Sequence, residues 1–123
     1  MKVLNSAEIK KVIYAQLEPK EDMYRAIVKL VEENDVNFGF LVALGTVERL
    51  RIGHAKPDKT FTEIIVDKPL EISTAFGRIW RDEKPQVHVH ITAGDKEGRA
   101  YAGHLLEGSP VAILAEIMIL KAL

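Results

Sequence analysis

Apolar and polar residues alternate along much of this chain, and the alternation is clearest between residues 87 and 106. There the apolar residues take every second position: Val87, Val89, Ile91 and Ala93. A two-residue period places these side chains on one face of a β-strand and the intervening His88 and His90 on the other. The polar segment Gly94–Gly98 comes next, with the glycines and charged residues of a turn. We therefore predict a β-hairpin here.

Five other segments have the apolar content of strands. They are residues 11–17, 38–52, 61–66, 70–80 and 111–120. In the second of these we expect a break or bend at Gly45, and in the fourth Gly77 marks a bulge or a close approach of another segment. The last is apolar almost throughout, which suits a strand covered on both faces or a buried helix. The preceding turn Gly108–Pro110 and the neighbouring strand patterns favour a strand.

One segment has helical spacing instead. Its apolar residues recur at the i, i+3, i+4, i+7 and i+8 positions: Met23, Ala26, Ile27, Leu30 and Val31. We place Glu21 and Asp22 in the first turn, where the helix dipole favours negative charge. Asn34–Asp35 is the expected end. One main helix with six to eight strands, many joined as hairpins, indicates an α+β fold.

Composition narrows the class of protein. The 123 residues are enough for one domain, spanning 1–123, and are 47% hydrophobic and 28% charged, as in globular proteins. The net charge is −1, and no basic stripe for nucleic acid is present. The absence of cysteine excludes disulfides and thiolate metal sites and favours a reducing cytoplasm. Neither a signal-peptide core nor a run long enough to cross a bilayer occurs, so no membrane partner is expected.

The hairpin brings histidines together. If its turn is symmetric about Lys96, His88 lies directly across from His104, and His90 lies across from Ala102. Three neutral imidazoles on one patch can supply three ligands to a tetrahedral zinc, leaving the fourth position to water or a small molecule. The alternative is a solvated sheet face with exposed histidines. A one-residue bulge beside His104 would turn its side chain to the other face and remove the site.

Four other residues have candidate chemistry. We interpret His54 as a surface residue without a partner. Glu116, alone in an apolar strand, is either an acid–base group near the metal or, as we favour, a glutamate paired at an edge or subunit interface. Arg78 and Arg81 flank Trp80, and a guanidinium stacked on the indole can hold an anionic ligand. A surface or subunit-contact patch is the commoner role of such a cluster.

The hairpin and the strand after it resemble a known signature. Residues 85–119 read PQVHVHITAGDKEGRAYAGHLLEGSPVAILAEIMI. They resemble the PPC domain (plant and prokaryote conserved domain, also called DUF296), which has a proline, an HxH strand, an Asp…Gly turn, a G-G-H-L segment and a closing strand with a central glutamate. Shorter pieces agree upstream: Glu21–Asp22, Ala43–Val47, Leu70–Ile72 and Gly77–Ile79. Ala102 replaces the first glycine of G-G-H-L, and Arg78 stands where the family often has asparagine. The resemblance covers about residues 10–120.

This resemblance implies a mostly antiparallel, strongly bent β-sheet with one main α-helix, assembled as a homotrimer. It also implies His88, His90 and His104 as ligands of zinc or another divalent transition metal. The fold is similar to that of acetolactate decarboxylase, whose zinc is held by an HxH pair and a later histidine. The basic AT-hook segments that give plant members minor-groove DNA binding do not occur in these residues.

Three functions are hypotheses at this point. The favoured one is a homotrimeric metal-binding PPC-domain protein of unassigned activity, a DNA-associated regulatory or assembly module whose partners are DNA or DNA-binding proteins. The alternative is a zinc-dependent lyase or hydrolase acting on a small carbonyl-containing molecule. In the third, the metal is structural and ties subunits together. No sequence pattern identifies catalytic residues or an organic cofactor.

Overall fold

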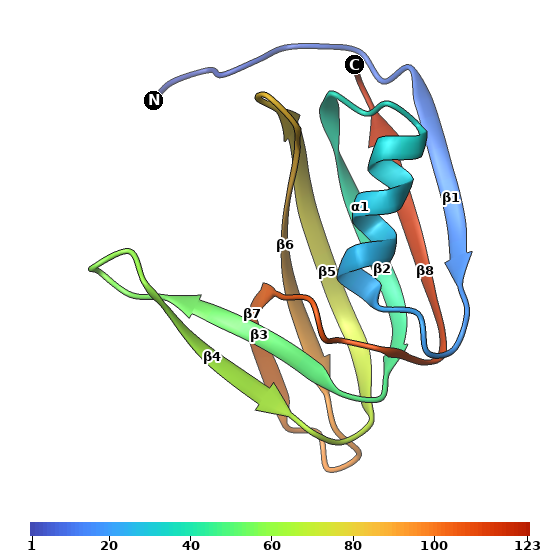
Figure 1. The fold of residues 1–123 in the computed structure, drawn as a ribbon, viewed down its shortest axis with the longest axis vertical. Helices are drawn as coiled ribbons and strands as arrows, with labels where there is room; N and C mark the ends of the chain where they lie inside the picture. The colour runs from blue at the N-terminus through green and yellow to red at the C-terminus, as the bar shows by residue number, and fades with distance from the viewer.

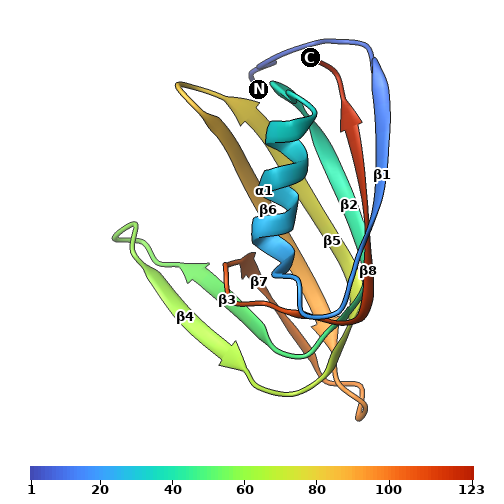
Figure 2. The same ribbon diagram turned by 45° about the vertical axis from the view of Figure 1, so that its right-hand side comes forward.

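One helix and eight strands build the protein, whose computed structural model describes residues 1–123 (Figure 1). Their bounds are β1 Lys11–Leu17, α1 Met23–Glu33, β2 Phe38–Val47, β3 Leu50–Ala55, β4 Phe61–Val66, β5 Leu70–Arg81, β6 Pro85–Gly94, β7 Ala100–Leu105 and β8 Val111–Lys121. All strands belong to one sheet in the order β1-β8-β2-β5-β6-β7-β3-β4, and every neighbouring pair is antiparallel. The sheet is strongly bent, with β3 and β4 turned away from the strands beside α1 (Figures 1 and 2). The predicted α+β class is confirmed.

The helix covers one face of the sheet (Figure 2). Met23, Ile27 and Val31 recur every four residues along α1 and are completely buried against the sheet. Burial of an aliphatic side chain of this size stabilises the fold by about 1.5–3 kcal/mol. The helix ends directly before Asn34–Asp35, as predicted, and it is neither long nor apolar enough to span a bilayer. The opposite face of the sheet, which we call the outer face, has no helix on it (Figure 2).

Asp22 precedes the helix and caps it. Its carboxylate accepts the N–H of Arg25 at 3.0 Å, so Glu21 and Asp22 lie before the first turn, and our placement of them inside it was wrong. The reason is that an N-cap carboxylate satisfies a free N–H directly, from an extended backbone conformation. The other Asp22 oxygen accepts the N–H groups of Gly108 and Ser109 at 2.7 and 2.8 Å. Asp22 therefore joins the helix to the segment between β7 and β8.

We predict that Asp22→Ala lowers the free energy of unfolding by about 2–4 kcal/mol, since it removes a helix cap and leaves two further N–H groups without their acceptor. Denaturant unfolding followed by circular dichroism measures the change. Glu33→Ala is the control, because Glu33 makes only an exposed ion pair with Lys29 at 3.8 Å. Equal losses in the two variants would contradict the capping role.

The chain from Phe38 to Ile52 differs from its prediction as a strand broken or bent at Gly45. It does bend at Gly45, where the register with β5 shifts and φ is +136°. A Cβ atom there would lie 2.4 Å from the carbonyl oxygen of Leu114, so only glycine fits this approach. The strand then ends at Val47, and β3 begins at Leu50 on the far side of the sheet. The other four strand predictions are confirmed.

Gly77 marks close packing and not a bulge. Its register with β2 and β6 is continuous, and a Cβ atom there would lie 2.9 Å from side-chain atoms of both Leu41 and Val89. Gly77 thus lets the helix-side layer close tightly. Its neighbours Phe76 and Arg78 consequently point to the outer face, where both are exposed.

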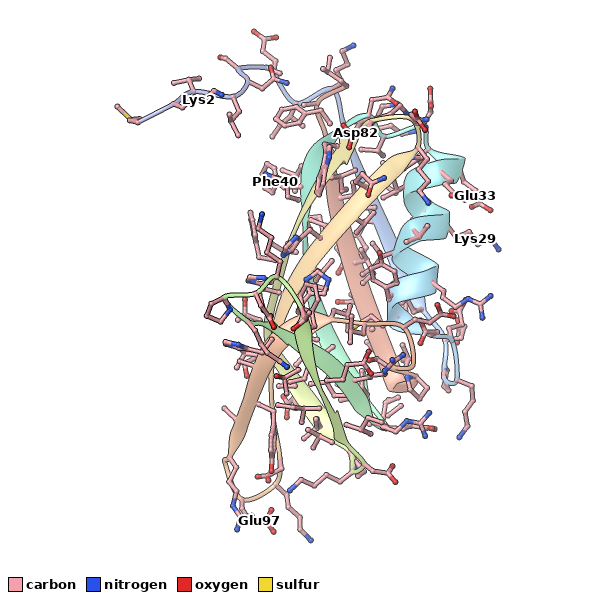
Figure 3. All side chains as sticks on the ribbon, turned by 60° about the vertical axis from the view of Figure 1, so that its left-hand side comes forward. Lys2, Lys29, Glu33, Phe40, Asp82 and Glu97 are labelled. Atoms are coloured by element: carbon pink, nitrogen blue, oxygen red, sulfur yellow. The ribbon has the colours of Figure 1, made fainter.

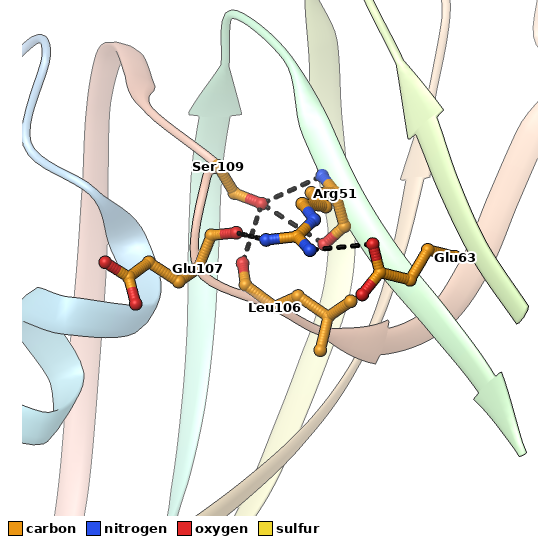
Figure 4. A network of polar contacts seen from close by, with 5 residues as sticks. All are labelled: Arg51, Glu63, Leu106, Glu107 and Ser109. Carbon is orange, nitrogen blue, oxygen red and sulfur yellow. Dashed lines mark hydrogen bonds and ion pairs between the residues drawn. The ribbon is translucent and has the colours of Figure 1, made fainter. Parts of the chain in front are cut away.

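A polar network holds β3 beside the end of β7 (Figure 4). The buried hydroxyl of Ser109 accepts the N–H of Arg51 at 2.9 Å and lies 3.1 Å from the carbonyl oxygen of Leu106, to which it donates. The Arg51 guanidinium donates to the carbonyl oxygen of Glu107 at 3.1 Å and pairs with Glu63 of β4 at 2.7 Å. These contacts fix the position of β3 and β4 relative to β7.

Candidate metal centre

The β6–β7 hairpin has a different register from the symmetric one we predicted. His90 pairs with His104, and Thr92 pairs with Ala102, so the predicted direct pairing of His88 with His104 is wrong. The observed register is displaced by two residues. Because side chains alternate with a period of two, this displacement leaves all three imidazoles on the same face. The ladder has no bulge next to His104.

Asp95 explains the register, because it organises the turn. Its carboxylate accepts the N–H groups of Glu97 and Arg99 at 3.0 and 2.9 Å, which builds the five-residue loop around Glu97 instead of Lys96. The same carboxylate pairs with Lys68 at 2.7 Å. The hydrogen bond from Lys68, with those from the two backbone amides, lowers the pKa of Asp95 to about 2. The turn is therefore anchored by a carboxylate that is ionised throughout the neutral range.

The three histidines converge on the outer face. Nε2 of His88 lies 3.0 Å from Nε2 of His90, and one ring nitrogen from each of the three residues lies within 4.8 Å of the others. The ring centroids of His88 and His104 are 4.4 Å apart, edge to face. Nδ1 of His104 is buried and has no hydrogen-bond partner. A buried ring nitrogen without a partner is uncommon, and a metal ion or a hydrogen-bonding group would satisfy it.

The surroundings favour neutral imidazoles. Burial lowers the pKa of His104, as do the nearby His88 and His90. Burial also lowers the pKa of His88, with smaller contributions from His90 and Arg78. Both rings are therefore neutral at pH 7, the form in which imidazole binds a metal.

This donor set fits a divalent transition metal. In a tetrahedral site with bonds of about 2.0–2.1 Å, two ligand nitrogens lie about 3.3 Å apart, close to the 3.0 Å between His88 and His90. Imidazole donors suit zinc, copper, iron and nickel, whereas the hard cations magnesium and calcium prefer oxygen. Three protein ligands leave a fourth position open toward the adjoining cavity.

The adjoining cavity, which we call the histidine cavity, has a volume of about 460 Å³. Its walls come from β3, β4, β6 and β7, and no acidic side chain lines it. His54 of β3 lines it and is exposed, as expected of a surface residue, but this position was not predicted. Phe61 of β4 lies with its ring centroid 5.5 Å from that of His104 and also lines it. The sequence pattern did not indicate that His54 and Phe61 line the cavity, because β3 meets β7 only through pairing of segments distant in the chain.

Glu116 lies elsewhere. It is on β8, and strands β2 and β5 separate β8 from β6 in the sheet, a distance of about 14 Å at the usual strand spacing. There it lines a different cavity with Tyr14, and its carboxylate raises the pKa of the Tyr14 hydroxyl through a hydrogen bond. The hypothesis that Glu116 is an acid–base group beside the metal is therefore wrong.

The two arginines near Trp80 have separate environments. Arg81 donates to the side-chain oxygen of Asn37 and pairs with Asp35 at 3.9 Å. Arg78 places its guanidinium carbon 4.1 Å from the centroid of the Trp80 ring, which is the stacking that the sequence indicated. No acidic group pairs with Arg78.

Comparison with known proteins places the chain in a family. The model of the Plants and Prokaryotes Conserved (PCC) domain, the domain also abbreviated PPC, matches residues 4–123. The chain belongs to this family. The PCC domain fold is shared with a metal-containing protein from Archaeoglobus fulgidus, which is 29% identical, with a TM-score of 0.88 over 99% of this chain and 86% of that one.

Two further structures show the same fold. A PPC protein from Pyrococcus horikoshii has a TM-score of 0.90 at 22% identity, covering 99% of this PCC domain and 85% of that chain. A Bacteroides thetaiotaomicron protein that its name provisionally calls DNA-binding has a TM-score of 0.84 at 23% identity, covering 95% and 85%.

A curated relative is much longer. The bifunctional protein GlmU of a Synechococcus strain is 27% identical over 110 residues. The match covers 89% of this PCC domain but only 16% of the GlmU chain. This relative therefore contains a segment like the PCC domain within a larger protein.

Proposed function

We propose that this PCC domain is a homotrimeric metal-binding protein whose ligands are His88, His90 and His104, with zinc or another divalent transition metal as the ion. The observation that carries the proposal is the convergence of three imidazoles, with one ring nitrogen of each within 4.8 Å of the others, in a triad whose buried His104 Nδ1 has no partner. The metal-containing Archaeoglobus relative, at 29% identity, supports it.

The apolar outer face supports self-association, which the proposed homotrimer requires. It carries a patch of exposed large apolar residues, which we call the apolar patch: Val12, Tyr14, Phe40, Val42, Leu44 and Phe76. Phe40 lies on the side of the sheet away from Lys29 and Glu33 of α1 (Figure 3). A contiguous apolar patch of this kind marks an interaction surface in soluble proteins. We infer that copies of the same chain cover it.

One row of paired residues connects the apolar patch to the metal centre. Across the sheet, Val42 pairs with Phe76, Phe76 with His90, and His90 with His104. The trimer contact and the metal centre consequently occupy the same face. A metal held at that place lies near the edge of a subunit interface, which suits the role of an assembly module.

The alternative is a zinc-dependent lyase or hydrolase acting on a small carbonyl-containing molecule. The observation that favours it is the histidine cavity, whose volume of about 460 Å³ is in the range of small-molecule sites. A bound zinc ion supplies Lewis acidity that polarises a carbonyl group. Of the chain's own residues, His54 lines the cavity outside the triad and is the side chain positioned to hold or move a proton there.

The metal proposal is tested on protein purified without a metal-affinity tag. We expect elemental analysis to find about one zinc or similar ion per chain. As the pH falls below the usual imidazole pKa of about 6.5, protons compete for the ring nitrogens and the ion is released. The lowered pKa values of His88 and His104 move this release to lower pH. A metal content that stays below about a tenth of an ion per chain after incubation with zinc at pH 7.5 would reject the proposal.

We also propose that the trimer associates with DNA through DNA-binding proteins and does not bind the duplex directly. The provisional name of the Bacteroides relative supports an association with DNA. With a net charge of −1, the chain lacks the excess of cations that drives phosphate binding. We expect no change in fluorescence anisotropy of labelled duplex DNA at 50–200 mM salt. Tight binding that weakens steeply with salt would contradict this and favour direct contact.

A further inference from the structure

Arg78 lies beside the histidine triad with an uncompensated charge. It pairs with His88 across β5 and β6, and directly paired residues of an antiparallel sheet have Cβ atoms about 4.5–5.5 Å apart. Both side chains are on the outer face and are exposed. Arg81, three residues along the same strand, pairs with Asp35, whereas no carboxylate contacts Arg78. Its guanidinium carbon lies 4.1 Å from the centroid of the Trp80 ring.

The charge around the cavity favours an anion. No acidic side chain lines the histidine cavity, so the protein does not neutralise a bound divalent ion there. Arg78, which pairs with His88 of the cavity wall, makes no ion pair either. Imidazole side chains add no negative charge. A cationic site with these properties attracts an anionic ligand, which supplies the missing charge.

The form of the guanidinium selects the class of anion. The guanidinium carbon of Arg78 lies 4.1 Å from the Trp80 ring centroid. The N–H edge of a guanidinium matches a carboxylate with two parallel hydrogen bonds. A phosphate dianion is usually bound by several donors, such as free N–H groups at a helix N-terminus. Here the backbone N–H groups of β5 and β6 are in a sheet ladder, and α1 lies on the other face.

We propose that Arg78 recognises the carboxylate of a small organic acid whose other end reaches the histidine triad. This proposal rests on the metal site proposed above and names the class of ligand for it. Because Arg78 pairs with His88 on the neighbouring strand, a small acid held at its carboxylate by Arg78 has its other end beside the triad. Arg78 is then the residue that distinguishes a charged acid from its neutral analogue.

The test uses protein loaded with cobalt(II), whose visible spectrum reports a change of ligand at the metal. Pyruvate is the probe, its neutral amide is the uncharged counterpart, and inorganic phosphate is the competing anion. We expect the spectral shift to give a dissociation constant for pyruvate at least tenfold lower than for the amide or for phosphate. Arg78→Gln should weaken pyruvate binding about ten- to a hundredfold, the range for a charge-assisted hydrogen bond, with no change in cobalt content.

Arg81→Gln is the matched control, because it removes the same charge from the same strand at a position paired with Asp35. It should leave pyruvate binding unchanged. Three results with cobalt-loaded protein would overturn the role of Arg78 while leaving the metal site standing. They are equal affinities for pyruvate and its amide, tighter binding of phosphate than of pyruvate, and equal effects of the two substitutions. Failure of the wild-type protein to bind cobalt would instead overturn the metal site and, with it, this inference.

Discussion

Alanine at His88, His90 or His104 is expected to abolish stoichiometric metal binding while the chain remains folded. Each substitution leaves two imidazoles, too few to close a tetrahedral site with one open position. Affinity should fall by more than the ten- to hundredfold that loss of an outer hydrogen-bond partner causes. His88 and His90 are exposed, so their truncation costs little stability. Truncation of His104 also removes the buried nitrogen that has no partner.

His54→Ala is the control for this series. His54 lines the same cavity but lies outside the triad, so its variant should keep full metal content. Metal content is measured by elemental analysis and folding by circular dichroism. Full occupancy in any triad variant, or an equal loss in His54→Ala, would contradict the assignment of ligands.

Phe76→Asp is expected to convert the proposed trimer to monomers. Phe76 is 56% exposed in the single chain and stacks on Phe40 with ring centroids 5.8 Å apart, at the β5 edge of the apolar patch. A carboxylate buried there in a subunit interface without a partner costs several kcal/mol per subunit. Light scattering coupled to size-exclusion chromatography should show the mass falling from three times the 13.8 kDa chain mass to one.

Ile65→Asp is the matched control for the oligomer. Ile65 is 61% exposed on the edge strand β4, outside the apolar patch, so its variant should remain a trimer. The Phe76→Asp monomer should still bind one ion, because β6 and β7 of one chain provide all three imidazoles. A wild-type monomer, or a trimer that survives the Phe76 substitution, would reject the outer face as the contact.

Which side chains share a face follows from the local order of residues. Alternation with a period of two is a property of the extended backbone, so the separation of Val87, Val89 and Ile91 from His88 and His90 needs no knowledge of neighbouring strands. For the same reason the triad survives the error in hairpin register, since a shift of two residues returns every side chain to its face. The apolar stripe of α1 is equally local, because the helix repeat sets it.

How these faces meet depends on contacts between segments far apart in the chain. The register depends on Asp95, whose pairing with Lys68 joins residues 27 apart. The placement of β3 beside β7 brings His54 and Phe61 to the cavity, and the order β8-β2-β5-β6 keeps Glu116 away from the triad. These pairings reflect burial summed over segments distant in the chain, and a local pattern of apolar residues does not encode them.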